Sequence, residues 1–394
     1  MRSKAFFLLL IGQANNSAVM VLYIIALMDV MWKQTGSVFI MSLVPVIITG
    51  TRFVSSLVAP LLLRRYALPT ILAGSQWTKS VLFLCLVSLI SFENVILLFF
   101  VVSMIAFLDG LSDPASQALL PQIVVKSDLM KANSTSSVVF ETVSMSCWPV
   151  GGILLVWLHA EGVFIAVIGF SIIAALFFSL VGLHAPQCRP HSQSVEWRVS
   201  MGIGWKKVLE TPWLRRVMAT TALEAIAGVV WIAAIVYVFV DEVLHVSQAW
   251  WGFMNASFFA GLILAGIILV KMAHVCERRL PLLLLIGFSG GAVLTTVFAL
   301  HAKPLLALLL VAGVGVCEQM RSVALHTILQ QQIEEEKLAY VYTVQGAVST
   351  LAFGMGAFLV GILADVMDIR VVYIGSALLL SGCFIIWLKT WKRM

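Results

Sequence analysis

The chemistry of this chain is expected at the ionisable side chains that interrupt its long apolar segments. A charged side chain at the centre of a bilayer costs at least ~2.5–3.5 kcal/mol on insertion scales, so such residues usually face the interior of a helix bundle or a wet cavity. The residues at such positions are Arg52, Lys79, Asp109, Asp113, Glu141, Glu224, Glu318, Arg321 and His326. They are candidates for ion coupling, substrate binding or structural ion pairs.

Two acids, Asp109 and Asp113, are four residues apart, so a helix would place both on one face, about 6 Å apart along its axis. Two carboxylates so close in a medium of low dielectric constant do not both ionise easily, and one could hold a proton. Pro114 follows at once and could bend the helix into a polar pocket or a gate hinge. The alternative is that Arg52 or Lys79 pairs permanently with one acid as a structural clamp.

Glu318 and Arg321 are three residues apart and can pair on one helix face, which would neutralise both. In the alternative, Arg321 acts as a gate. It would bind an acid of the first half, Asp109, Asp113 or Glu141, when the cytoplasmic side is closed, and release it when that side opens.

Glu224 lies about 14 Å into its apolar segment at 1.5 Å per residue, close to the midplane. It has no obvious partner in its own segment. With Asp109 it is the leading candidate to take up a proton or to bind a cationic substrate amine. A hydrogen-bonded, permanently neutral Glu224 is the alternative.

Polar and basic residues of the first half are candidates to line a central cavity. Gln13, Asn15 and Asn16 interrupt the first apolar segment and could bind a substrate or bridge helices. Arg52 and Lys79 could supply a positive potential suited to an anionic or zwitterionic substrate, such as a modified amino acid, a peptide or a siderophore. Alternatively, each neutralises a carboxylate.

The elements that position these residues are apolar helices. Hydrophobic residues make up 61% of the 394 residues and charged residues 11%, against roughly 45–50% and about 25% in soluble domains. Twelve segments approach or exceed the ~18–20 residues that cross a bilayer. They run from Ala5 to Leu27, Val38 to Leu63, Thr70 to Ile90, Val95 to Leu119, Ser136 to Leu158, Val163 to Leu183, Val217 to Phe239, Trp250 to Lys271, Leu280 to Leu300, Leu305 to Leu329, Ala339 to Leu363 and Val371 to Leu388.

Basic residues predict the orientation. Nineteen Lys and Arg residues fall in one set of loops and the two ends, and three in the opposite loops, so both termini are expected in the cytoplasm. The net charge of +6 is then topological, and no nucleic-acid partner is expected. The six cysteines lie in segments or inner loops and are expected to be reduced, without a metal site.

The longest break between apolar segments, Ala185 to Leu214, divides the chain into two sets of six. The predicted division is an N-terminal six-helix bundle at 1–184, a cytoplasmic loop at 185–214 and a C-terminal six-helix bundle at 215–394. The second part of the loop is amphipathic and predicts a helix on the inner membrane surface, with a plain linker as the alternative. In paired six-helix halves the substrate site lies near the midplane.

The whole chain resembles the major facilitator superfamily, and within it the exporter branch of macrolide efflux proteins, the enterobactin exporter and the bacilysin exporter. Short motifs carry this resemblance: Thr35-Gly36-Ser37, Asp113-Pro114-Ala115, Leu120-Pro121, Ala132-Asn133, Trp148-Pro149-Val150-Gly151-Gly152, Gly204-Trp205, Thr211-Pro212-Trp213-Leu214-Arg215, Leu329-Gln330-Gln331-Gln332 and Gly361-Ile362-Leu363-Ala364-Asp365. The resemblance implies an all-α integral membrane fold of twelve helices in two bundles.

The expected function is therefore secondary transport and not enzymatic catalysis. The resemblance implies export, and the interior acids suit coupling to protons, so we expect a proton-coupled exporter of a small toxic compound. That compound would be an antibiotic, including a self-produced peptide antibiotic such as bacilysin, or a siderophore. The alternatives are an uptake symporter or facilitator of a small polar metabolite and, with less support, a lipid enzyme or a channel.

No ATP-binding signature occurs, so an ion gradient would supply the energy without a cofactor. The expected partners are the substrate and the bilayer. The protein is expected to be a monomer that spans the plasma or inner membrane of the cell several times.

Overall fold

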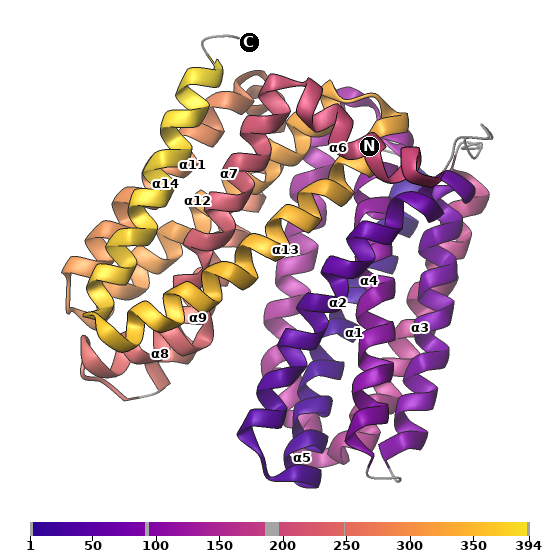
Figure 1. Ribbon diagram of the computed structural model, residues 1–394, viewed down its shortest axis with the longest axis horizontal. Coiled ribbons are helices and arrows are strands. Elements are labelled where there is room, and N and C mark those ends of the chain that lie inside the picture. Colours follow the sequence, from indigo (N-terminus) through magenta and orange to yellow (C-terminus); the bar gives the residue numbers. More distant parts are fainter. Residues whose placement is uncertain (1–2, 91–93, 186–196, 248, 392–394) are drawn as a thin grey trace. The chain divides into compact units, whose positions relative to one another are not determined.

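The computed structural model describes residues 3–90, 94–185, 197–247 and 249–391 (Figure 1), and all regular elements within these ranges are helical. The helices of the first half are α1 (Lys4–Thr35), α2 (Val38–Arg65), α3 (Leu68–Ile90), α4 (Val95–Ile123), η1 (Lys126–Asp128) and α5 (Leu129–His184). They are followed by α6 (Trp197–Glu210), α7 (Pro212–Gly228), η2 (Val229–Trp231), α8 (Ala233–Glu242), α9 (Ala249–Lys271), α10 (Ala273–Cys276), η3 (Glu277–Arg279), α11 (Leu280–Leu300), α12 (Pro304–Gln332), α13 (Glu335–Val366) and α14 (Ile369–Trp391).

Among the described residues, ten helices are long and apolar enough to cross a membrane, or eleven if the bent pair Pro212–Trp231 and Ile235–Glu242 is one span. A helix satisfies its backbone hydrogen bonds internally, which a hydrocarbon solvent requires. The chain is therefore a multi-pass membrane protein. The prediction of twelve crossings and of cytoplasmic termini stays a prediction.

Helix α5 has 56 residues and contains a non-helical residue, His159, at φ 55 and ψ 179. At 1.5 Å per residue it would be about 84 Å long, well over twice the thickness of a hydrocarbon core. The break at His159 divides it into two arms, and each arm alone is long enough to span. The two segments predicted on either side of this position correspond to those arms.

The chain forms two compact units. Unit 1 comprises Met1–Val125, Thr142–Trp205 and Glu334–Ala347. Within it α4 packs between α2 and α3, and α1 contacts α2 and α4 (Figure 1). Buried Tyr23, Phe83 and Phe164 join α1, α3 and the second arm of α5 in one apolar core. This core packs together the helices that carry the ionisable residues predicted in the apolar segments of unit 1.

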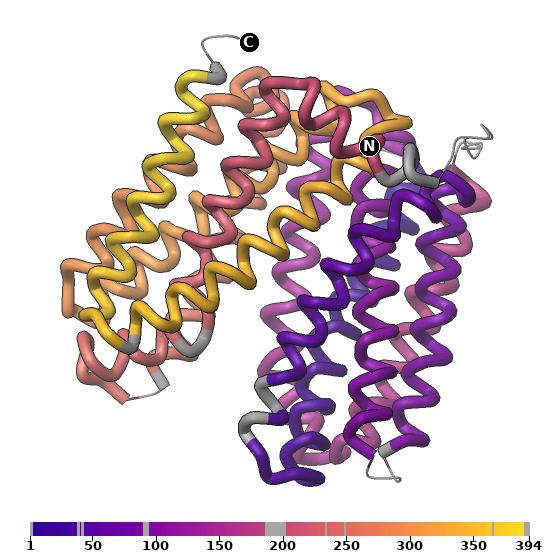
Figure 2. Tube along the Cα trace, viewed as in Figure 1, coloured from indigo at the N-terminus to yellow at the C-terminus, as the bar shows by residue number. Residues whose placement is uncertain are grey.

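Unit 2 comprises Lys126–Glu141, Lys206–Ile333 and Val348–Met394. Its helices α9, α12, α11, α14 and α7 pack each on the next, in that order, along the part of the trace that runs from red through orange to yellow (Figure 2). Phe239 and Phe298 stack with their ring centroids 4.3 Å apart. The buried Tyr373 hydroxyl donates to the Val230 carbonyl oxygen at 2.8 Å, so this aromatic core has a satisfied polar group.

The predicted boundaries follow chain order, whereas the two units group residues by contact, so the division at 1–184, 185–214 and 215–394 stays a prediction. Residues 186–196, the polar first part of the predicted central loop, lie outside the described residues. Its amphipathic second part forms helix α6. The position of α6 on a membrane surface also stays a prediction.

Candidate functional site

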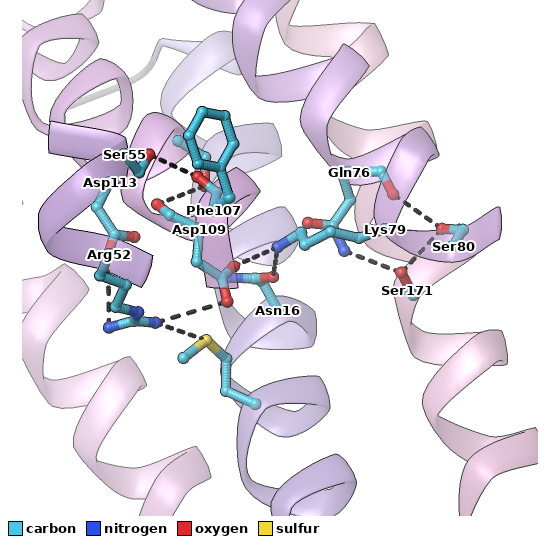
Figure 3. A network of polar contacts seen from close by, with 12 residues as sticks. Asn16, Arg52, Ser55, Gln76, Lys79, Ser80, Phe107, Asp109, Asp113 and Ser171 are labelled. Atoms are coloured by element: carbon cyan, nitrogen blue, oxygen red, sulfur yellow. Dashed lines mark hydrogen bonds and ion pairs between the residues drawn. The ribbon is translucent and has the colours of Figure 1, made fainter. Parts of the chain in front are cut away.

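Four charged residues of unit 1 gather at one place where α1, α2, α3 and α4 meet (Figure 3): Arg52, Lys79, Asp109 and Asp113. Lys79 of α3 and Asp109 of α4 form its centre, with Nζ and Oδ1 2.7 Å apart and side chains 2% and 4% exposed. Lys79 Nζ also donates to Asn16 Oδ1 of α1 at 2.8 Å. This buried ion pair is hydrogen-bonded on a further side, as a stable buried pair requires.

Arg52 of α2 joins the same cluster by longer contacts. Its Nη2 is 3.5 Å from Asp109 Oδ2, and its Nη1 is 4.0 Å from Asp113 Oδ2. The sulfur of Met20, a weak acceptor, lies 3.5 Å from Nη2, and the buried Nε has no hydrogen-bond partner within the described chain. The Asp113 side chain is 52% exposed. The edge formed by Arg52 and Asp113 is therefore loosely bonded and open.

Small polar residues fix the helices around the cluster. Ser55 of α2 donates to the carbonyl oxygen of Phe107 of α4 at 2.6 Å. Ser55 lies about one turn after Arg52, and Phe107 lies two residues before Asp109. On the other side, Gln76 of α3 donates to Ser171 of α5 at 3.1 Å. These interhelical bonds hold the helices that carry the ion pairs.

Gln13, Asn15 and Asn16 of α1 differ in their hydrogen-bond partners. Gln13 Nε2 donates to Ser116 Oγ of α4 at 2.5 Å, and Asn16 accepts from Lys79. Asn15 donates to the Ile11 carbonyl oxygen of its own helix at 2.9 Å. The structure thus brings Asn16 into the charge cluster, links Gln13 to α4 and leaves Asn15 outside.

Unit 2 has a second charge cluster, centred on Arg321 of α12, whose side chain is 4% exposed. Arg321 Nε donates to Glu224 Oε1 of α7 at 2.6 Å, and Nη1 donates to the Gly287 carbonyl oxygen of α11 at 3.0 Å. Nη2 bonds Glu318 of the same helix. Glu224, which has no partner on α7, thus finds one on a neighbouring helix.

Two glycines of α11 make room for Arg321. A Cβ on Gly291 would lie 2.7 Å from Arg321 Nη1, and one on Gly287 would lie 2.9 Å from the Cys317 carbonyl oxygen. The ring of Phe288 lies 5.2 Å from the guanidinium carbon, within cation–π distance. Gly287 and Phe288 were not among the predicted site residues, although the glycine-rich run 287–291 signals a close approach.

The second cluster carries more acid than base. Glu224 and Glu318 share one guanidinium, with side chains 21% and 39% exposed. Glu141 of α5 is near enough to repel Glu318 electrostatically. In unit 1, by contrast, two acids face two bases. A proton taken up in unit 2 would reduce an excess of negative charge.

Residues of two motifs that carry the resemblance meet in unit 2. Asn133 Nδ2 donates to Gln330 Oε1 at 2.7 Å and to Thr327 Oγ1 at 3.1 Å. These bonds join the start of α5 to the end of α12. Within the described residues, no group of three or more His, Cys, Asp or Glu could hold a metal ion.

Two proteins of Bacillus subtilis (strain 168) are similar to nearly the whole chain, although no family model matches it. Uncharacterized MFS-type transporter YfmI is 27% identical over 390 residues, which cover 96% of this chain and 94% of YfmI. Uncharacterized MFS-type transporter YjbB is 28% identical over 391 residues, which cover 98% of this chain and 95% of YjbB.

Solved structures show the same fold. A bacterial homologue of the iron transporter ferroportin, in its outward-facing state, superimposes with a TM-score of 0.78 at 12% identity and covers 98% of this chain and 100% of that one. The fucose:proton symporter FucP of E. coli superimposes with a TM-score of 0.74 at 11% identity, and the superposition covers 98% of each chain. Both of these proteins are transporters. The chain is therefore similar over nearly its whole length to two MFS-type transporters of Bacillus subtilis, and it has the fold of these solved transporters.

Proposed function

We propose that this transporter exports a small toxic compound in exchange for protons across the cell membrane. The compound would be an antibiotic, including a self-produced peptide antibiotic, or a siderophore, and transport would give resistance or self-protection. The observation that carries the proposal is the pair of carboxylates, Glu224 and Glu318, on one guanidinium in membrane-spanning helices. The protein acts as a monomer and needs no cofactor beyond the ion gradient.

The charge balance of this cluster supports proton uptake. One guanidinium neutralises one of the two carboxylates, so the second leaves a net negative charge between membrane-spanning helices, where charge is costly. A proton bound by either carboxylate would neutralise that charge. Glu318 is 39% exposed, which gives water a route to that proton.

Asp109 is less suited to this role, although it stands beside Glu224 among the sequence candidates. It is 4% exposed and lies against two cations, Lys79 at 2.7 Å and Arg52 at 3.5 Å. Two cations therefore already face its one negative charge. We therefore place proton exchange in unit 2, with Glu141 close to it, and assign Asp109 to the structural centre of unit 1.

Export, as opposed to uptake, rests on the resemblance to the exporter branch. The fold itself serves both directions, since FucP is a proton symporter. Everted membrane vesicles with an acidic interior separate the two. A macrolide, a catecholate siderophore or a short peptide antibiotic would be added outside while a fluorescent dye reports the internal pH.

An exporter that exchanges substrate for protons makes the interior more alkaline when its substrate is added. A symporter would carry protons inward with the substrate. In a second set of vesicles, prepared without a pH gradient, it would therefore make the interior more acidic. The Glu318→Gln variant should lose the alkaline response, and Arg65→Gln, which alters a basic residue at the end of α2, should keep it. A wild-type response in Glu318→Gln would refute the coupling role.

A further inference from the structure

The pair formed by Arg52 and Asp113 has unused bonding capacity on both sides. A guanidinium has five N–H donors, and the Arg52 side chain is 29% exposed although its Nε is buried without a partner in the described chain. Its contacts to Asp109 and Asp113 are 3.5 and 4.0 Å long. Shorter, paired bonds to a carboxylate are the geometry that arginine favours. Arg52 is therefore positioned to bind a further carboxylate.

Asp113 has the complementary property. Its side chain is 52% exposed, and its contact with Arg52 is 4.0 Å long. Asp109, one turn earlier, is 4% exposed and bound to Lys79 at 2.7 Å. The two acids that the sequence places on one helix face thus differ. Asp109 is bound to a buried cation, whereas Asp113 is available to the cationic group of a ligand.

We propose that the Arg52–Asp113 pair binds substrates that carry a carboxylate and an ammonium close together, such as amino acids and short peptides with free ends. The ligand carboxylate binds the Arg52 guanidinium, and the ligand ammonium binds the Asp113 carboxylate. This assignment rests on the proposed transport function, and it names the class of substrate.

The charge of the cluster selects for such a zwitterion. Arg52 and Lys79 balance Asp109 and Asp113, so the cluster is neutral before a ligand enters. A zwitterion keeps this balance. A ligand with one charge would add a net charge to membrane-spanning helices, where an unbalanced charge is unfavourable. Arg321 of unit 2 is less suited to this role, because its side chain is 4% exposed and each of its three nitrogens already donates.

Binding would be measured by titrating the purified, detergent-solubilised protein with L-alanyl-L-alanine and following its thermal unfolding. The N-acetylated dipeptide lacks the ammonium, and the C-terminal amide lacks the carboxylate. We expect the free dipeptide to bind the wild type about tenfold or more tightly than either blocked form, since each blocked end removes one of the two ion pairs between ligand and protein. Equal binding of the three compounds, or no binding of the free dipeptide, would overturn the proposal.

Two variants test which residue binds each charged end of the dipeptide. In Asp113→Asn the preference for the free over the acetylated dipeptide should disappear, while the preference over the amide remains. In Arg52→Gln the pattern should be reversed. Arg65→Gln, on the same helix, is the control and should keep both preferences. Because each result is a ratio within one variant, a general loss of stability does not imitate it, and a variant that loses both preferences together would contradict the assignment.

Failure of this inference can be told from failure of the proposed function. If the dipeptides bind with the expected preferences but never discharge a pH gradient in vesicles, the substrate site stands and proton coupling fails. If another compound discharges the gradient through Glu318 while no dipeptide binds, coupling stands and the zwitterion site is wrong.

Discussion

Arg321 and Arg52 both lie in apolar helices and both face two carboxylates, but they are bonded differently. Arg321 is 4% exposed, and each of its three nitrogens donates to an oxygen. Arg52 is 29% exposed, and its two ionic contacts are 3.5 and 4.0 Å long. A buried guanidinium with a bond from each nitrogen holds helices together, whereas a more exposed one with only long contacts can bind a ligand. The contrast predicts that replacing each arginine lowers the free energy of unfolding by a different amount.

Replacing Arg321 should have the largest effect. Arg321→Gln leaves Glu224 and Glu318 without their cation, and breaking a buried ion pair in this way costs about 3–5 kcal/mol. Arg52→Gln should cost about 1 kcal/mol or less, because its contacts are long and partly exposed. Chemical unfolding of both variants in detergent gives the two free energies of unfolding. Equal losses would abolish the distinction between the two arginines.

The buried pair in unit 1 provides the next test. Lys79→Met leaves Asp109 buried and charged, with an expected loss of about 3–5 kcal/mol in the free energy of unfolding. The double variant Lys79→Met with Asp109→Leu removes both charges and should recover most of that loss. The same unfolding measurement applies. If the double variant is no more stable than Lys79→Met alone, the pair does not account for the stability of this cluster.

The two clusters should also differ in transport. We expect Glu318→Gln to reduce pH-gradient-driven transport about tenfold or more while the protein stays folded, because it removes the more exposed of the two acids that share one cation. Asp109→Asn should instead reduce the amount of folded protein. Size-exclusion chromatography beside the vesicle assay separates these results. A folded Asp109→Asn variant that has lost only coupling would move the proton site to unit 1.

A smaller effect is expected from the glycine that lies against Arg321. In Gly291→Ala the new methyl group would lie 2.7 Å from Arg321 Nη1, and such crowding costs about 1–3 kcal/mol. Gly375→Ala of α14 is the matched control, because a Cβ there has no neighbour within 4 Å. Thermal unfolding of the two variants should differ, and identical curves would show that α11 does not confine the guanidinium.

The smallest effect concerns α1. Gln13→Ala removes an interhelical hydrogen bond to Ser116 and should cost about 0.5–1.5 kcal/mol. Asn15→Ala removes a bond within one helix and should cost less. Chemical unfolding with both variants measured side by side resolves the difference. A larger loss in Asn15→Ala would reverse the roles given to these two residues.

Sequence reasoning identified the charged residues because charges in apolar segments are rare and costly. It offered Lys79 or Arg52 as a partner of one acid of α4 but could not choose between them. It could not pair Glu224 with Arg321, because that pair depends on which helices are neighbours and how each is rotated. It also missed Gly287, whose contribution is a backbone carbonyl and the absence of a side chain. The break in α5, in contrast, could be predicted, since His159 lies in the gap between the apolar segments that end at Leu158 and begin at Val163.

The direct test of the account compares driven transport with exchange, for any compound that the wild type moves in vesicles. If Glu224 and Glu318 carry the proton, the Glu318→Gln variant will still exchange labelled for unlabelled compound at equal pH, but it will not concentrate the compound when a pH gradient is imposed. If Glu318→Gln concentrates the compound as well as the wild type does, the proton does not pass through this cluster.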